Sequence, residues 1–305
     1  MDFTGFTSAD FAAFEQKKWQ SHAFNLERLQ VKQKLEALGK RIGLLGADGA
    51  LLEQHVSAES PVLWNQHRVD RQYLFFSRNE AAKKELDAIV NRERSFASML
   101  EDPSPLRNHI FLHVTIDNDH VEVGLKLHVD ARVDRDNLLR KCNDFFAREK
   151  ILQRINGLPA GFCTGMVNAE QRQRLDDEQF QKLIADFADS ASWLTIHRDY
   201  GAQDPIVGEG AFADRVADDL RALLPLMQEI AWTRENDFLE IGKRLADNVV
   251  RQKSKGLKKN DRVRVLRGLL AGQAGVVQSV DGKGALKVLV GKMTIKLAGE
   301  DVTKL

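Results

Sequence analysis

Hydrophobic and polar residues alternate over residues 109–129, which read HIFLHVTIDNDHVEVGLKLHV. Apolar side chains occupy every second position on both sides of the segment DNDH, whose composition is typical of a hairpin turn. If Ile116 pairs with Val121, each apolar residue of one strand lies opposite an apolar residue of the other. The pattern therefore predicts an antiparallel hairpin with one apolar and one polar face.

The rest of the first 250 residues alternates between strand-like and helix-like segments. Short apolar and aromatic runs at 72–78 and 192–200 indicate strands, and 157–166 reads as a loop or an edge strand. Apolar residues at helical spacing predict one or two helices before Gly43. Further helices are predicted over 79–100, 134–155, 170–190 and 211–250, the last with a kink or break at Pro225. These elements indicate an α+β fold, a mixed helical body with an antiparallel sheet.

The C-terminal segment has a different character. Residues 257–305 read LKKNDRVRVLRGLLAGQAGVVQSVDGKGALKVLVGKMTIKLAGEDVTKL, a series of short strands separated by glycines. Short strands with glycine at their corners are typical of a small, strongly bent β-barrel. We therefore expect three segments: an acidic α+β domain over 1–250, a basic linker over 251–257 and a barrel over 258–305.

Charge supports this division. Residues 251–305 contain 13 Lys and Arg and 4 Asp and Glu, a net charge of +9. The remaining 45 − 13 = 32 basic and 44 − 4 = 40 acidic residues give the first 250 residues a net charge of −8. Two segments of opposite charge suggest two modules with different partners, the basic one being suited to a polyanion.

Two resemblances to known families follow from these segments. The basic strand, the run AGQAGVV and the final VLVGKMTIKLAGEDVTKL are similar to a KOW module, and most similar to that of the MutS-two ATPases. This resemblance covers 257–305 and implies an SH3-like β-barrel that binds RNA, a ribosomal surface or, in some members, protein. Residues 5–42 resemble the opening of the uncharacterised YktB-like family, which implies an α+β fold and no known activity.

The basic residues around the start of the predicted barrel are the candidate nucleic-acid ligands. They are clustered with a single intervening acid, which favours contact with phosphates over a merely solvated surface. Residues 251–305 contain no aromatic side chain, so we expect recognition of the backbone or shape rather than stacking on bases. The candidates are Lys253, Lys255, Lys258, Lys259, Arg262, Arg264 and Arg267.

The polar face of the predicted hairpin carries the candidate metal ligands. His109, His113 and His128 fall on this face, and the expected register places His109 opposite His128. Three neighbouring imidazoles could bind zinc. We favour the simpler interpretation, in which the histidines are incidental to a solvated or helix-covered face.

A catalytic alternative uses the same hairpin. Asp117, Glu122 and Lys126 resemble the Asp…Glu-x-Lys pattern of metal-dependent nucleases, in which carboxylates hold the metal. Three residues separate Glu122 from Lys126 where the pattern has one, and Asp117 fits a turn equally well.

Other catalytic signals are weak. Cys142 and Cys163 have no identified base nearby in the sequence, and no phosphate-binding glycine motif occurs. We therefore expect a non-enzymatic cytoplasmic adaptor without a cofactor, which binds RNA, a ribosome or a DNA backbone through its C-terminal barrel and does not contact a membrane. The alternatives are a metal-dependent nuclease or hydrolase working through residues 109–128, and a protein–protein interaction module in which the N-terminal domain also has a protein partner.

Overall fold

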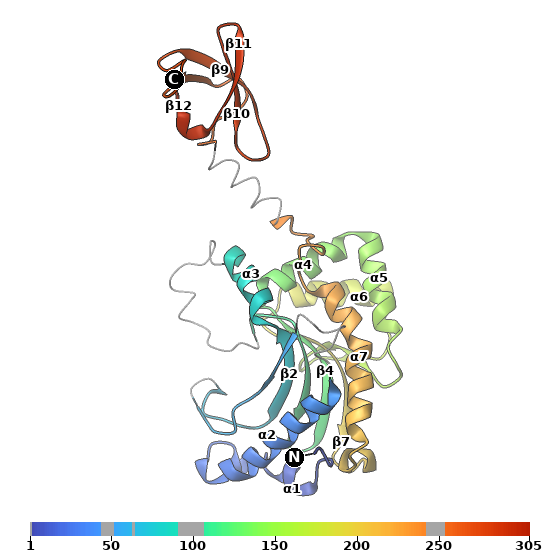
Figure 1. Ribbon diagram of the computed structural model, residues 1–305. Coiled ribbons are helices and arrows are strands. Elements are labelled where there is room, and N and C mark those ends of the chain that lie inside the picture. Colours follow the sequence, from blue (N-terminus) through green and yellow to red (C-terminus); the bar gives the residue numbers. More distant parts are fainter. Residues whose placement is uncertain (1, 44–51, 63–64, 91–106, 242–253) are drawn as a thin grey trace. The chain divides into compact units, whose positions relative to one another are not determined.

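The structure is a computed structural model that describes residues 2–43, 52–62, 65–90, 107–241 and 254–305 (Figure 1). The chain forms two compact units, Met1–Phe238 and Leu239–Leu305. This division falls before the expected boundary at residue 250. Residues 242–253, which include the first three residues of the expected basic linker, lie outside the described residues.

The first unit is built around one antiparallel sheet of seven strands in the order β1-β2-β3-β4-β7-β5-β6. Ile116 pairs with Val121, so the predicted hairpin register is confirmed. Strand β7 lies beside β4, although three helices and two short strands separate the two along the chain. The strands are β1 Leu52–Val56, β2 Gln72–Arg78, β3 Phe111–Ile116, β4 His120–His128, β5 Cys163–Met166, β6 Gln171–Arg172 and β7 Trp193–Gly201.

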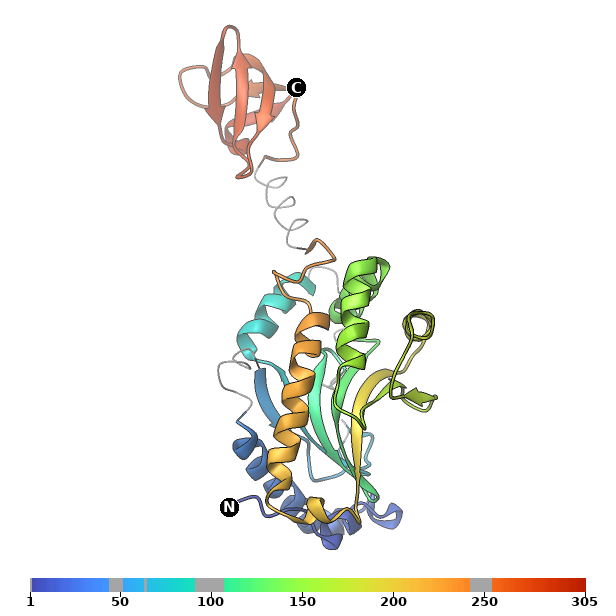
Figure 2. The ribbon, with the colours of Figure 1, turned by 90° about the vertical axis from the view of Figure 1, so that its right-hand side faces the viewer.

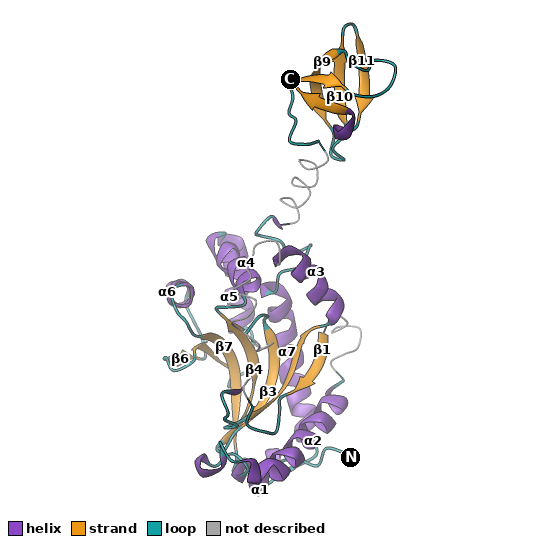
Figure 3. Cartoon of the chain, turned by 90° about the vertical axis from the view of Figure 1, so that its left-hand side faces the viewer, coloured by secondary structure: helices purple, strands orange, loops and turns teal. Residues whose placement is uncertain are grey.

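Helices cover the apolar face of this sheet. Helix α7 lies in front of the sheet in Figure 2 and behind it in Figure 3, and α2 packs on the same core. Apolar residues that alternate along β3 and β4, such as Leu112, Val114 and Leu125, are completely buried there. The helices are α1 Ser8–Ala12, α2 Asn25–Ile42, α3 Glu80–Val90, α4 Arg132–Asn143, α5 Phe145–Asn156, α6 Asp177–Ala188 and α7 Phe212–Ile230.

The middle of the polar face is also buried, although the side chain of Asp199 on the same face is exposed; we expected a solvated or helix-covered face. His113, Thr115 and Lys126 are 0%, 2% and 6% exposed. Large side chains from neighbouring strands, including Phe75 and Phe111, occupy the same face and pack against His113 or each other. These neighbours shield the polar groups, because strand pairing places every second residue of all the strands on one side.

Several predicted helices are shorter or broken. The first 42 residues form α1, two 3₁₀ turns and α2, and the buried Arg28 donates to the carbonyl oxygens of Lys18 and Ser21 in the connecting segment. The predicted helix 134–155 divides at Asp144, which is extended and accepts a hydrogen bond from the Ala147 N–H as the N-cap of α5. Helix α7 ends at Ile230 and is not split at Pro225, and residues 242–250 of the predicted helix 211–250 lie outside the described residues.

The second unit is a five-stranded antiparallel sheet in the order β11-β10-β9-β8-β12, with its own apolar core. Leu257, the last residue of the expected linker, is buried in this core. Gly275 is required for packing, because a Cβ there would lie 2.6 Å from the Val288 side chain and 2.8 Å from the Leu289 carbonyl oxygen. The strands are β8 Arg262–Val265, β9 Ala274–Val280, β10 Leu286–Val290, β11 Met293–Leu297 and β12 Val302–Lys304.

Among the described residues of both units, no helix combines the length and the apolar composition that crossing a bilayer requires.

Candidate functional site

Strand β8 presents the basic residues of the second unit to solvent. Arg262 and Arg264 are exposed, whereas Val263 and Val265 between them are buried. Both arginines therefore project from one outer face of the strand. Alternation along a strand produces this arrangement, since the two valines are needed in the core.

The other candidate cations lie around this strand. Lys255, Lys258, Lys259 and Arg267 are all exposed, and Lys253 lies outside the described residues. We call the six described residues the basic segment: Lys255, Lys258, Lys259, Arg262, Arg264 and Arg267.

The carboxylates of the second unit have other partners. Asp261 lies 2.8 Å from Lys304, and Asp281 lies 3.0 Å from Lys296. These contacts lower the pKa of both carboxyls, that of Asp281 to about 2. In the part of the unit that the structure describes, no member of the basic segment forms an ion pair with a carboxylate. Among the described residues, the cations of the basic segment are therefore not held in ion pairs.

The three predicted histidines have separate surroundings on the first unit. His113 Nδ1 lies 2.8 Å from Thr115 Oγ1. His128 accepts a hydrogen bond from the Asp130 N–H at 3.1 Å and packs against Trp193. His109 precedes β3, which begins at Phe111, so the expected strand pairing of His109 with His128 is not formed.

Glu122 and Lys126 form a buried ion pair on the polar face, with Lys126 Nζ 2.6 Å from Glu122 Oε1. Burial opposes ionisation of Glu122, but the charge and hydrogen bond of Lys126, together with His113 and His197, outweigh it and lower the pKa of Glu122 to about 2. Burial, followed by the charge of Lys126, lowers the pKa of His113 well below its usual value. Glu122 is therefore a carboxylate at neutral pH, beside an imidazole whose protonation is disfavoured.

Asp117 serves the hairpin turn. Its Oδ1 accepts hydrogen bonds from the backbone N–H groups of Asp119 at 2.9 Å and His120 at 3.1 Å. The same oxygen lies 3.1 Å from His120 Nδ1. The Asp117–Glu122–Lys126 triad of the catalytic alternative is thus divided between a turn and an ion pair.

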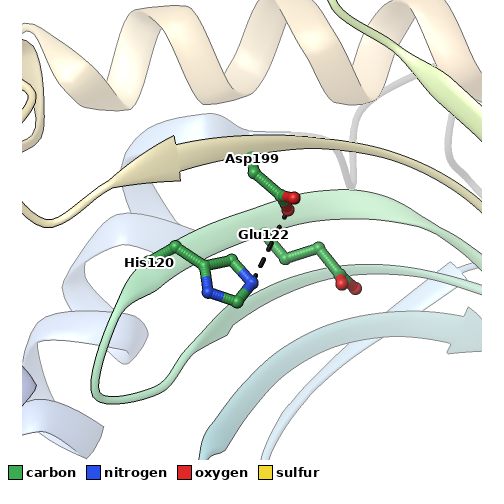
Figure 4. Close-up of side chains that lie close together, drawn as sticks. All are labelled: His120, Glu122 and Asp199. Atoms are coloured by element: carbon green, nitrogen blue, oxygen red, sulfur yellow. Dashed lines mark ion pairs between the residues drawn. The ribbon is translucent and has the colours of Figure 1, made fainter. Parts of the chain in front are cut away.

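Another group of potential ligands lies where β4 meets β7. His120, Glu122 and Asp199 offer three donor atoms within 4.8 Å of one another, and His120 and Asp199 turn toward each other across the two strands (Figure 4). His120 Nε2 lies 3.6 Å from Asp199 Oδ1. Among the described residues this is the group that places at least three metal-binding side chains together, and it excludes the three predicted histidines.

Sequence reasoning missed His120 and Asp199. His120 lies two positions before Glu122 on the same strand face, which was a usable signal. Asp199 had no such signal, because only the pairing of Glu122 with Asp199 between β4 and β7 brings it there.

The two cysteines offer little nucleophilic chemistry. Burial raises the pKa of Cys142 to about 12, and burial also raises that of Cys163. A thiol with a raised pKa holds little of the thiolate form that attacks substrates.

Comparison with known proteins adds no family. No protein-family model matches the sequence, and no curated protein matches it.

Proposed function

We propose that this protein is a non-enzymatic adaptor whose second unit binds the phosphate backbone of RNA, free or in a ribosome, through the basic segment. The observation that carries the proposal is the outward projection of Arg262 and Arg264 from β8, without a described acidic partner. An arginine can donate two parallel hydrogen bonds to one phosphate, and each cation that contacts the backbone releases a condensed counterion.

The remainder of the second unit fits this proposal. We take its five antiparallel strands to be an SH3-like barrel of the KOW kind, in agreement with the resemblance over 257–305. Without an aromatic residue in 251–305, the unit has no platform on which bases could stack. Recognition would therefore depend on charge and backbone shape, and little on base sequence.

The first unit has another role in this scheme. A net charge of −8 over residues 1–250 disfavours contact with a polyanion. We assign it a protein partner, in a cytoplasmic adaptor that needs no cofactor for binding.

The test is a double charge reversal on β8. Arg262→Glu with Arg264→Glu should weaken binding of a fluorescent RNA and should flatten the plot of log affinity against log salt by about two, one for each lost contact. The matched control, Lys283→Glu with Lys292→Glu, makes the same charge change at exposed residues in the turns after β9 and β10. Fluorescence anisotropy at several salt concentrations measures both slopes.

Two results would overturn the proposal. Undiminished RNA binding by the β8 variant would mean that the arginines are only a solvated surface. Equal losses in both variants would mean that net charge, and not the basic segment, determines affinity. Circular dichroism of the variants establishes that the second unit remains folded, as expected when the substituted side chains are outside the core.

A further inference from the structure

We infer that the first unit contains a binding site for one divalent transition-metal ion, formed by His120, Glu122 and Asp199. This site lies on the polar face of the seven-stranded sheet and is independent of the proposed RNA-binding segment. The three residues come from β4 and β7.

The arrangement of charges is the first argument. Glu122 and Asp199 are direct cross-strand partners in the pairing of β4 with β7. Two like charges placed directly opposite each other destabilise a sheet. Lys126 lies 2.6 Å from one oxygen of Glu122. Among the described residues, Asp199 has only histidines within ion-pair distance, namely His120 and His197, each at 3.6 Å. A bound cation between the two carboxylates removes this repulsion.

The orientation of His120 is the second argument. Its Nδ1 lies 3.1 Å from Asp117 Oδ1, while its Nε2 is directed toward Asp199. Asp117 is itself held by two backbone N–H groups of the turn. A carboxylate that holds one ring nitrogen of a histidine fixes the tautomer that presents the other nitrogen to a metal.

Access is the third argument. The side chains of His120 and Asp199 are 31% and 51% exposed, whereas that of Glu122 is 13% exposed. The donor atoms therefore meet at the border between a buried ion pair and solvent, where an ion can enter. Three protein ligands leave a coordination position for water or a substrate.

The donor set determines the class of ion. One imidazole nitrogen and two carboxylate oxygens suit Zn²⁺ and similar first-row ions better than Mg²⁺ or Ca²⁺, which prefer oxygen ligands alone. Binding would leave the Glu122–Lys126 ion pair in place, because Glu122 has a second carboxylate oxygen.

The experiment is calorimetric titration of untagged, chelator-treated full-length protein with Zn²⁺, and in parallel with Mg²⁺. We expect saturation at about one Zn²⁺ per chain and a weaker response to Mg²⁺. Asp199→Asn and His120→Gln should each lower the Zn²⁺ affinity at least about tenfold, and Asp117→Asn should lower it by about 10- to 100-fold through loss of the histidine's orientation. The control His22→Gln removes an exposed imidazole from another part of the unit and should bind like the original protein.

Thermal unfolding with and without Zn²⁺ gives a second readout. The ion should raise the unfolding temperature of the original protein and of His22→Gln, because it binds only the folded state. It should not raise that of Asp199→Asn, whose side chain is half exposed and whose substitution leaves the core intact. Absence of saturable binding, or equal Zn²⁺ affinity in Asp199→Asn and His22→Gln, would overturn the inference.

Discussion

At the scale of single residues, the buried pair of Arg78 and Asp134 joins several elements of the first unit. The two oxygens of Asp134 each lie 2.6 Å from a guanidinium nitrogen of Arg78. They also accept hydrogen bonds from the backbone N–H groups of Ile110 and Trp232. The carboxylate is therefore satisfied by charge-assisted bonds from β2, the start of β3 and the segment after α7.

Asp134→Asn should destabilise the first unit by about 3–5 kcal/mol, because it leaves the Arg78 guanidinium buried without a counter-charge. Burial opposes ionisation of Asp134, but Arg78 and the backbone donors hold its pKa below the usual value. A carboxyl with a lowered folded-state pKa contributes stability above its unfolded pKa of about 3.9, and this contribution is lost as the pH falls further. The original protein should therefore lose more stability than the variant between pH 5 and acid conditions, as measured by urea unfolding over a pH series.

The control for this substitution is Asp136→Asn in the same helix. Asp136 is 45% exposed and contacts the neighbouring Arg135, so its replacement should change stability by no more than about 0.5 kcal/mol. If the two variants are equally stable, or if acid affects Asp134→Asn as strongly as the original protein, the buried pair is not a stabilising contact.

Single-residue contacts were only partly predictable from the sequence. Side chains alternate between the two faces of a strand, so the sequence predicts that Glu122 and Lys126 share a face. The structure places both in one ion pair. Arg78 and Asp134 are 56 positions apart. No periodicity connects such residues, because their meeting depends on how helices dock against the sheet.

At the scale of elements, strands were predicted better than helices. Alternation marks both ends of a strand, since each residue's face is fixed by its neighbours. The ends of a helix depend on hydrogen bonds with capping and tertiary groups, which the spacing of apolar residues does not reveal. Helix α5 begins because Asp144 caps it, and the segment after α7 is held by the bond from Trp232 to Asp134.

The N-terminus of helix α6 allows the stability contributed by one capping residue to be measured. Asp176 accepts a hydrogen bond from the Gln179 N–H at 2.8 Å, and Gln179 Oε1 accepts one from the Asp176 N–H at 3.1 Å. Asp176→Ala removes this reciprocal cap and should cost about 0.5–2 kcal/mol of unfolding free energy. Asp186→Ala, at an exposed position inside the same helix, should be close to neutral. Equal costs in urea unfolding would show that the cap contributes nothing beyond the loss of charge.

At the scale of the whole molecule, the presence of two modules was visible in the charge distribution and in the change from long helices to short strands. The order of strands in the first sheet could not be predicted from the sequence. Strand β7 lies between β4 and β5 in the sheet, and neither of these strands is next to it along the chain. Sequence patterns identify strands and their faces, but pairing between distant strands depends on the packing of the complete core.

The separate cores predict separate unfolding. The core of the second unit consists of its own buried residues, from Leu257 to Val302, and includes none from the first unit. A fragment of residues 254–305 should therefore fold alone, although a domain of this size has marginal stability.

All four tryptophans lie in the first 238 residues, so tryptophan fluorescence follows the first unit, while far-UV circular dichroism follows both. Urea unfolding of the full chain should give transitions that differ between the two probes. Val263→Asp, at a completely buried position of β8, should abolish the folding of the fragment and leave the fluorescence transition unchanged. Coincident transitions in the full chain, together with an unfolded fragment, would mean that the second unit depends on the first for its stability.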